Sequence, residues 1–83
     1  MSRLLRHPER LWVRENDRGE PLFLCHAGKL QPVRTIQARW RVDVGWWGKA
    51  VVREYFRVET PELVCEVYRD LQNGGWYLQR LYD

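Results

Sequence analysis

The sequence predicts a small all-β domain, and three observations carry this prediction. Polar and apolar residues alternate with a period of two along most of the chain after residue 10, as in strands that bury one face. Turn-forming residues interrupt the alternation at short intervals. The 83-residue chain also holds five tryptophans, four tyrosines and two phenylalanines, large enough to fill the core of so short a chain. We therefore predict about six antiparallel strands in a meander, rolled into a small open barrel that protects the sheet edges.

The strands are expected at residues 11–15, 22–26, 31–44, 50–59, 63–71 and 76–82. The cluster from Asn16 to Pro21 and then Ala27-Gly28-Lys29 close the first two strands. Pro61 ends the fourth, because proline cannot donate to a central ladder. Asn73-Gly74-Gly75 tolerates the positive φ of a tight turn, so the last two strands should form a hairpin.

Two segments fit this scheme less simply. Residues 31–44 make a strand so long that it needs a bend or bulge to stay on a small core. Residues 1–10 precede the barrel of residues 11–83, and Leu4 and Leu5 suit either an arm that packs on the barrel or one short helical turn.

The alternation also assigns side chains to the two faces of the third and fourth expected strands. The inward set is Ile36, Ala38, Trp40, Val42, Val52, Phe56 and Val58, with Glu54 as its one charge. The outward set is Thr35, Gln37, Arg39, Arg41, Arg53, Tyr55 and Arg57. In this phase Trp40 is a core residue, and Trp76 should be another because it is in phase with Leu78.

Trp46 and Trp47 lie between Gly45 and Gly48, at the expected turn between the third and fourth strands. Adjacent residues of an extended segment point to opposite faces, so both rings cannot enter the core of one sheet. At least one should be accessible. The pair suits either a lid over the barrel mouth or a surface that binds a partner, where tryptophan is enriched.

Positive charge is concentrated in the same segment. Residues 34–57 carry a net charge of +4, whereas the rest of the chain sums to −1. Most of the basic residues are arginine, which makes planar contacts with phosphates and base edges, although a GC-rich genome or a thermophilic source would also enrich arginine. The candidate binding residues are Arg39, Arg41, Trp46, Trp47, Lys49, Arg53, Tyr55 and Arg57. Arginines can neutralise phosphates while aromatic rings stack on bases, but an ordinary solvated sheet face with cross-strand pairs has the same composition.

Catalytic and metal sites receive little support. Cys25 and His26 are neighbours and point to opposite faces, and His7 and Cys65 lie at no ligand spacing, so no metal or cofactor is expected. The alternative is a metal-dependent nuclease, in which the carboxylates of Glu54, Glu66 and Asp70 converge. Arg53, Arg57 and Arg69, which lie near these carboxylates in the sequence, favour ion pairs instead. The lack of an apolar membrane span or signal-peptide core predicts a cytoplasmic protein.

Several motifs resemble those of one bacterial family. They are Trp40, Trp46-Trp47, Arg53-Glu54-Tyr55-Phe56-Arg57-Val58, Tyr68-Arg69-Asp70-Leu71, Gly75-Trp76-Tyr77-Leu78 and Tyr82-Asp83. This small uncharacterised family occurs as a stand-alone protein and as the C-terminal appendage of ImuB-like proteins, which are catalytically degenerate relatives of Y-family translesion polymerases. The resemblance covers about residues 29–83 and is weaker over residues 1–28. It implies a non-catalytic module in DNA-damage tolerance that binds DNA or a protein of a translesion polymerase complex.

The sequence therefore predicts a binding module without catalytic activity. The favoured ligand is nucleic acid, as single-stranded or distorted DNA, and the alternative is a protein partner that docks on the same aromatic and basic surface. The sequence leaves the oligomeric state open.

Overall fold

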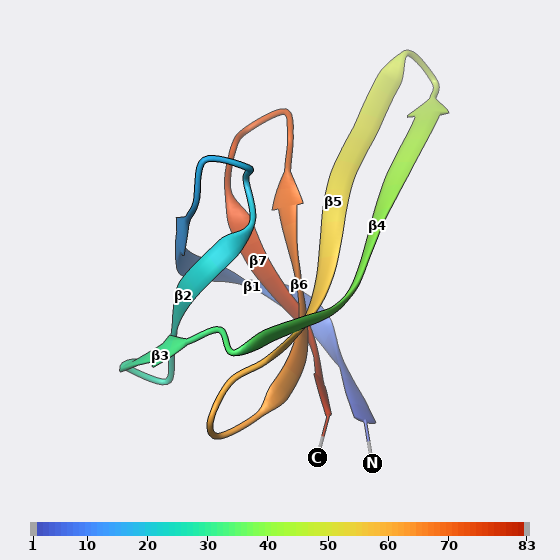
Figure 1. Ribbon diagram of the computed structural model, residues 1–83. Helices are drawn as coiled ribbons and strands as arrows, with labels where there is room; N and C mark the ends of the chain where they lie inside the picture. Colours follow the sequence, from blue (N-terminus) through green and yellow to red (C-terminus); the bar gives the residue numbers. More distant parts are fainter. Residues whose placement is uncertain (1, 83) are drawn as a thin grey trace.

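The computed structural model describes residues 2–82, which form one curled, fully antiparallel sheet without helices (Figure 1). Its seven strands are β1 (Ser2–Glu15), β2 (Pro21–His26), β3 (Lys29–Pro32), β4 (Thr35–Trp46), β5 (Lys49–Glu59), β6 (Val64–Asp70) and β7 (Trp76–Tyr82). The predicted all-β fold is confirmed. So are the predicted hairpins, since β4 pairs with β5 and β6 with β7.

The order of the strands explains why the sheet curls. They lie in the order β3-β2-β1-β7-β6-β5-β4, so the first and last strands of the chain pair with each other, and β3 and β4 are the two edges. Only Val33 and Arg34 connect these two edge strands. Because so short a connection must join opposite edges, the sheet bends until the edges meet at that end. The fold is an open, curled half-barrel whose seam lies between β3 and β4.

The structure corrects two details of the predicted elements. Residues 2–10 form the first part of β1, which pairs with β7, and not an arm or a helical turn. The ladder is irregular between Leu4 and Glu9, a segment that contains Pro8 and therefore lacks one backbone donor. The long strand predicted at residues 31–44 is divided into β3 and β4. The bend or bulge expected in this segment is confirmed, since β4 has a bulge between Ile36 and Ala38.

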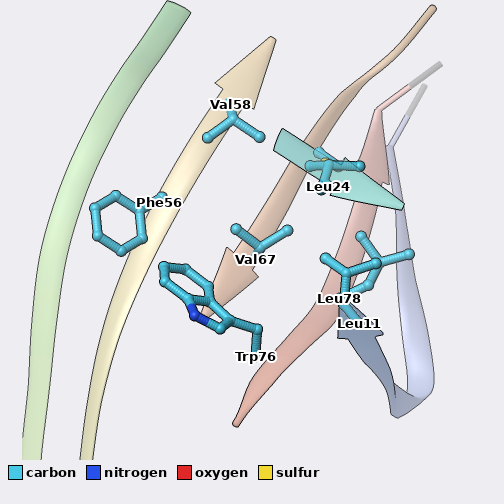
Figure 2. Close-up of a cluster of buried hydrophobic side chains, with 8 residues drawn as sticks. Leu11, Leu24, Phe56, Val58, Val67, Trp76 and Leu78 are labelled. Atoms are coloured by element: carbon cyan, nitrogen blue, oxygen red, sulfur yellow. The ribbon is translucent and has the colours of Figure 1, made fainter. Parts of the chain in front are cut away.

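The hydrophobic core lies on the inner face of the curl. Leu24 of β2 belongs to the same buried cluster as Phe56 and Val58 of β5, although three strands separate β2 from β5 in the sheet (Figure 2). Such residues can meet only if the sheet bends toward this face. The predicted burial of Trp76 is confirmed, and its ring lies 5.5 Å from that of Phe56.

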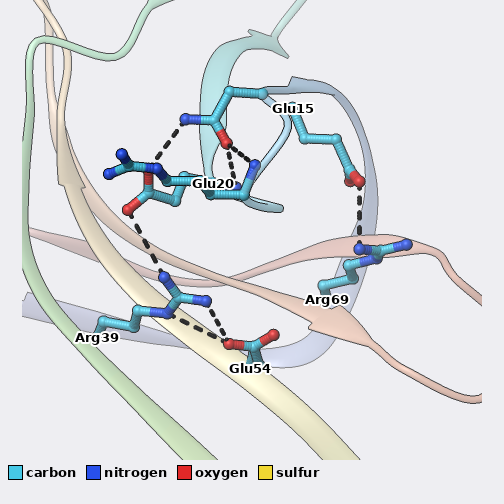
Figure 3. Close-up of polar contacts among 7 residues, drawn as sticks. Glu15, Glu20, Arg39, Glu54 and Arg69 are labelled. Carbon is cyan, nitrogen blue, oxygen red and sulfur yellow. Dashed lines mark hydrogen bonds and ion pairs between the residues drawn. The ribbon is translucent and has the colours of Figure 1, made fainter.

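Polar contacts connect each edge strand to segments on the other side of the seam. Arg39 of β4 lies between Glu54 of β5, at 2.8 Å, and Glu20 of the β1–β2 loop, at 3.6 Å (Figure 3). At the other end of β4, the buried hydroxyl of Thr60 donates a hydrogen bond to the side-chain oxygen of Gln31 on β3. These contacts hold the seam together without a continuous backbone ladder.

The end of the β4–β5 hairpin projects from the sheet as an arm, which we define as residues 44–51 (Figure 1). The pairing of β5 with β6 begins at Arg53 and Asp70, preceded by one hydrogen bond from the Leu71 N–H to the Val52 carbonyl. Beyond this point the two strands of the hairpin pair only with each other within residues 2–82.

Candidate nucleic-acid interface

The predicted surface divides between the two faces of the sheet. Arg39 is the cross-strand partner of buried Phe56, with its guanidinium 5.1 Å from that ring, and Arg41 is the partner of Glu54. Both arginines therefore lie on the inner face. Arg53, Tyr55 and Arg57 lie on the outer face, so the prediction of one surface containing all five was wrong.

The bulge in β4 causes this error. One extra residue between Ile36 and Ala38 shifts the alternation for the rest of the strand, and a shift of one residue moves every following side chain to the other face. Ile36 still packs on the core as predicted. Trp40, which was predicted to be a core residue, lies half-buried on the outer face instead. Glu54 lies on the inner face, as predicted, and pairs with Arg39.

A row of neighbouring aromatic rings crosses the outer face. Trp40, Tyr55, Tyr68 and Tyr77 come from β4, β5, β6 and β7 in turn, with ring centroids 5.4, 5.0 and 5.1 Å apart. The guanidinium of Arg10, on β1, continues the row 5.6 Å from the Tyr77 ring. The register of the strands produces this row, because neighbouring members are cross-strand partners and their side chains lie next to each other on one face.

Two arginines lie over aromatic rings of the outer face, Arg53 over a ring of this row and Arg57 over Tyr82 beside it. The guanidinium of Arg53 is 4.5 Å from the Tyr68 ring, and that of Arg57 is 5.2 Å from the Tyr82 ring. A hydrogen bond from Arg53 to the Tyr55 hydroxyl is the main cause of its raised pKa. Burial raises the pKa of Tyr68, against the opposing effect of Arg53. These arginines already have aromatic partners, so part of their role is to hold the outer face together.

The three carboxylates considered for catalysis do not converge. Glu54 lies on the inner face against Arg39, whereas Glu66 lies on the outer face, 3.8 Å from Arg57, and accepts a hydrogen bond from Tyr82. The carboxylate of Asp70 accepts hydrogen bonds from two backbone N–H groups of the β6–β7 turn. Within residues 2–82 no group of three or more histidine, cysteine or acidic residues could hold a metal ion.

The turn at the end of the arm places a tryptophan in an unfavourable conformation. Trp47 has φ +49° and Gly48 has φ +77°, as the central residues of a type I′ hairpin turn require. Asparagine or glycine normally occupies the first position, because a bulky residue there is strained. Trp47 is 87% exposed, which confirms that at least one ring of the pair is accessible. Lys49 is also exposed beside the turn, while the side chain of Trp46 lies outside the described part of the structure.

An exposed part of the outer face was missed by the sequence reasoning. On β1, Arg10, Trp12 and Arg14 all point outward and are exposed, and Trp12 is 56% exposed. The ladder sets Trp12 opposite Cys25 and Arg14 opposite Phe23, and then Cys25 opposite Leu30, which is 60% exposed. We call this surface the outer platform: Arg10, Trp12, Arg14, Phe23, Cys25 and Leu30. Its signal in the sequence is the alternation Arg-Leu-Trp-Val-Arg, which places an aromatic ring between two arginines on one face.

The fold and this face define the class of the protein: a small curled β-sheet domain with its hydrophobic core on the inner face and an aromatic and basic outer face. No family model matches the chain, and no curated protein or solved structure matches it significantly. Within residues 2–82 there is no helix long and apolar enough to span a membrane.

Proposed function

We propose that this protein is a non-catalytic module that binds single-stranded or distorted DNA through its outer face. The observation that carries the proposal is the outer platform, where an exposed tryptophan lies between two exposed arginines on one strand. Bases stack on exposed aromatic rings without regard to sequence, and arginines neutralise the phosphates that follow the same path. The similarity to the appendage of ImuB-like proteins, noted from the sequence motifs, suggests that the module serves DNA-damage tolerance in the cytoplasm.

The strained turn at Trp47 supports the same function. A strained residue persists where the surrounding structure or a function requires it, and Gly48 already supplies the glycine that the turn needs. A tryptophan held at the end of a projecting arm suits an aromatic contact with a base. The arm and the outer platform would then hold two parts of one strand.

The alternative is that a protein partner docks on the outer platform. The exposure of Trp12, Leu30 and Phe23 favours it, because a cluster of exposed apolar side chains marks many protein interfaces. The two functions differ in their response to salt. Phosphate contacts weaken steeply as ionic strength rises, whereas an interface centred on apolar side chains changes little.

Fluorescence anisotropy with a labelled oligothymidine separates these functions. We expect weak binding that falls steeply between about 50 and 200 mM salt. Arg10→Ala and Arg14→Ala should each reduce the slope of the logarithm of the binding constant against the logarithm of the salt concentration by about one, the value for one phosphate contact. Trp12→Ala should weaken binding about 5- to 150-fold, the range for loss of one stacked base.

Arg3→Ala is the matched control. It removes an exposed arginine from the same strand, but Arg3 is the cross-strand partner of Leu81, which packs against the core, so it lies on the inner face. Equal losses for Arg3→Ala and Arg14→Ala would mean that net charge alone governs binding. A folded wild-type protein that binds no oligonucleotide at low salt would refute the proposal and favour the protein partner.

A further inference from the structure

We propose that two copies of this chain pair through the free edge of β4 and form a dimer with one continuous antiparallel sheet. This inference is independent of what the outer face binds. It rests on the exposed edge, on the direction of its backbone groups, and on the charges that alternate along it.

β4 is a long edge strand. It pairs only with β5 within the described residues, and its far end continues into the projecting arm. An unpaired edge presents a row of N–H and C=O groups on which another strand can be added. β3, the other edge, has only four residues, and one of them is Pro32. The edge suited to pairing is therefore that of β4.

The tight turn determines which residues of β4 have unpaired backbone groups. Trp46 and Lys49 flank the two central residues of the turn and exchange hydrogen bonds, so the alternation of an antiparallel ladder directs the groups of Val44 and Val42 toward β5. The groups of Gly45, Asp43 and Arg41 then point to the free edge. The Val52 carbonyl accepts a hydrogen bond from the Leu71 N–H, so it points away from β4. Val52 is the cross-strand partner of Asp43. The backbone groups of this pair therefore point away from each other, which agrees with the assignment of the Asp43 groups to the free edge.

The side chains of these same residues are self-complementary. If a second β4 runs antiparallel about a twofold axis at Val42, Arg41 of each copy lies opposite Asp43 of the other. Both side chains are exposed, at 57% and 64%, and they lie on the same face of the sheet, 3.8 Å apart within one copy. On the outer face, Val42 would lie opposite Val42 of the other copy, and Trp40 opposite Val44 of the other copy. Apolar residues therefore face apolar residues across the two strands.

The neighbouring registers are less favourable. Moving the axis by one residue to Arg41 or to Asp43 sets two like charges directly opposite each other, which destabilises a ladder. In the register centred on Val42, Arg39 lies opposite Gly45, which adds no side chain near the ion pairs that Arg39 makes with Glu20 and Glu54. Charge and backbone geometry therefore select the same register.

Sedimentation velocity over a range of protein concentrations tests this dimer. We expect Arg41→Asp and Asp43→Arg to weaken self-association at least about tenfold each, because both cross-strand pairs become repulsive. An equimolar mixture of these two variants should form a heterodimer, since positions 41 and 43 are then both acidic in one chain and both basic in the other. The double variant Arg41→Asp/Asp43→Arg restores opposite charges and should associate like the wild type.

Hydrogen exchange gives an independent measurement on the wild type. The amides of Arg41 and Asp43 should exchange rapidly in dilute protein and become protected as its concentration rises, while the amides of Val42 and Val44 stay protected throughout. Circular dichroism checks that each variant is folded. A wild type that remains monomeric at high concentration would overturn the proposal, as would a dimer that both single variants form equally well.

Discussion

The assignment of side chains to the two faces of β4 and β5 can be tested by comparing how much stability is lost when Phe56 or Trp40 is truncated. Phe56 is completely buried on the inner face, where its ring contacts Trp76. Trp40 is the larger side chain, but it is half-buried on the outer face and stacks on Tyr55 at 5.4 Å. The two residues therefore reverse the order of stability loss expected from side-chain size alone.

We expect Phe56→Ala to lower the free energy of unfolding by about 3–5 kcal/mol, as for other buried phenylalanines. Trp40→Ala should lower it by about 1–2 kcal/mol, because it removes one stacked pair and part of an exposed surface. A chain of 83 residues has a total stability of about 4–12 kcal/mol. The first variant should thus be close to unfolding, and the second should remain folded.

Urea unfolding followed by far-UV circular dichroism measures both losses, provided that the slope of the free energy of unfolding against urea concentration is the same for all the variants. Trp47→Ala is the control, and its stability should lie within about 0.5 kcal/mol of the wild type, because that side chain is exposed. If Phe56→Ala does not fold, Phe56→Leu should still be less stable than the wild type, by up to about 1.5 kcal/mol. A larger loss for Trp40→Ala than for Phe56→Ala would refute the bulge and the faces that it sets.

Further predictions concern the thiols and the turns. Burial, aided by Glu66, raises the pKa of the Cys65 thiol from 9.0 to about 12, so the protein is stabilised below pH 9 and loses this contribution as the pH rises toward 12. The free energy of unfolding should therefore fall less steeply over this range for Cys65→Ala than for the wild type, and equal slopes would contradict the burial of the thiol. A thiol reagent at pH 8 should modify half-exposed Cys25 rapidly and Cys65 only after denaturation, which mass spectrometry can follow. Trp47→Asn and Ala27→Asn should each stabilise the protein by about 0.5–1 kcal/mol, because both positions have positive φ and precede a glycine in a tight turn. Only Trp47→Asn should weaken oligonucleotide binding, and a thermal melt that falls for both variants would show that the turns are not strained.

Local features of the sequence determined much of this fold. The period-two alternation and the turn residues depend only on neighbours along the chain, so they predicted the hairpins β4–β5 and β6–β7 and the exposure of a tryptophan at the end of the arm. They also predicted that Glu54 faces inward and that Trp76 is buried. In each case the pattern lies within one strand or one turn and needs no information about distant residues.

Tertiary structure decided which strands meet and which side chains share a face. The length of the predicted strand indicated a bend or bulge, but the alternation of residues 35–46 does not mark its position after Ile36, and the bulge there moves Arg39, Arg41 and Trp40 to the faces opposite those predicted. The pairing of β1 with β7 joins the two ends of the chain, and it alone sets Arg10 beside Tyr77. An alternating sequence specifies two faces but not their relation to the faces of another strand, because that relation depends on register, and register is decided by packing between residues far apart in the chain.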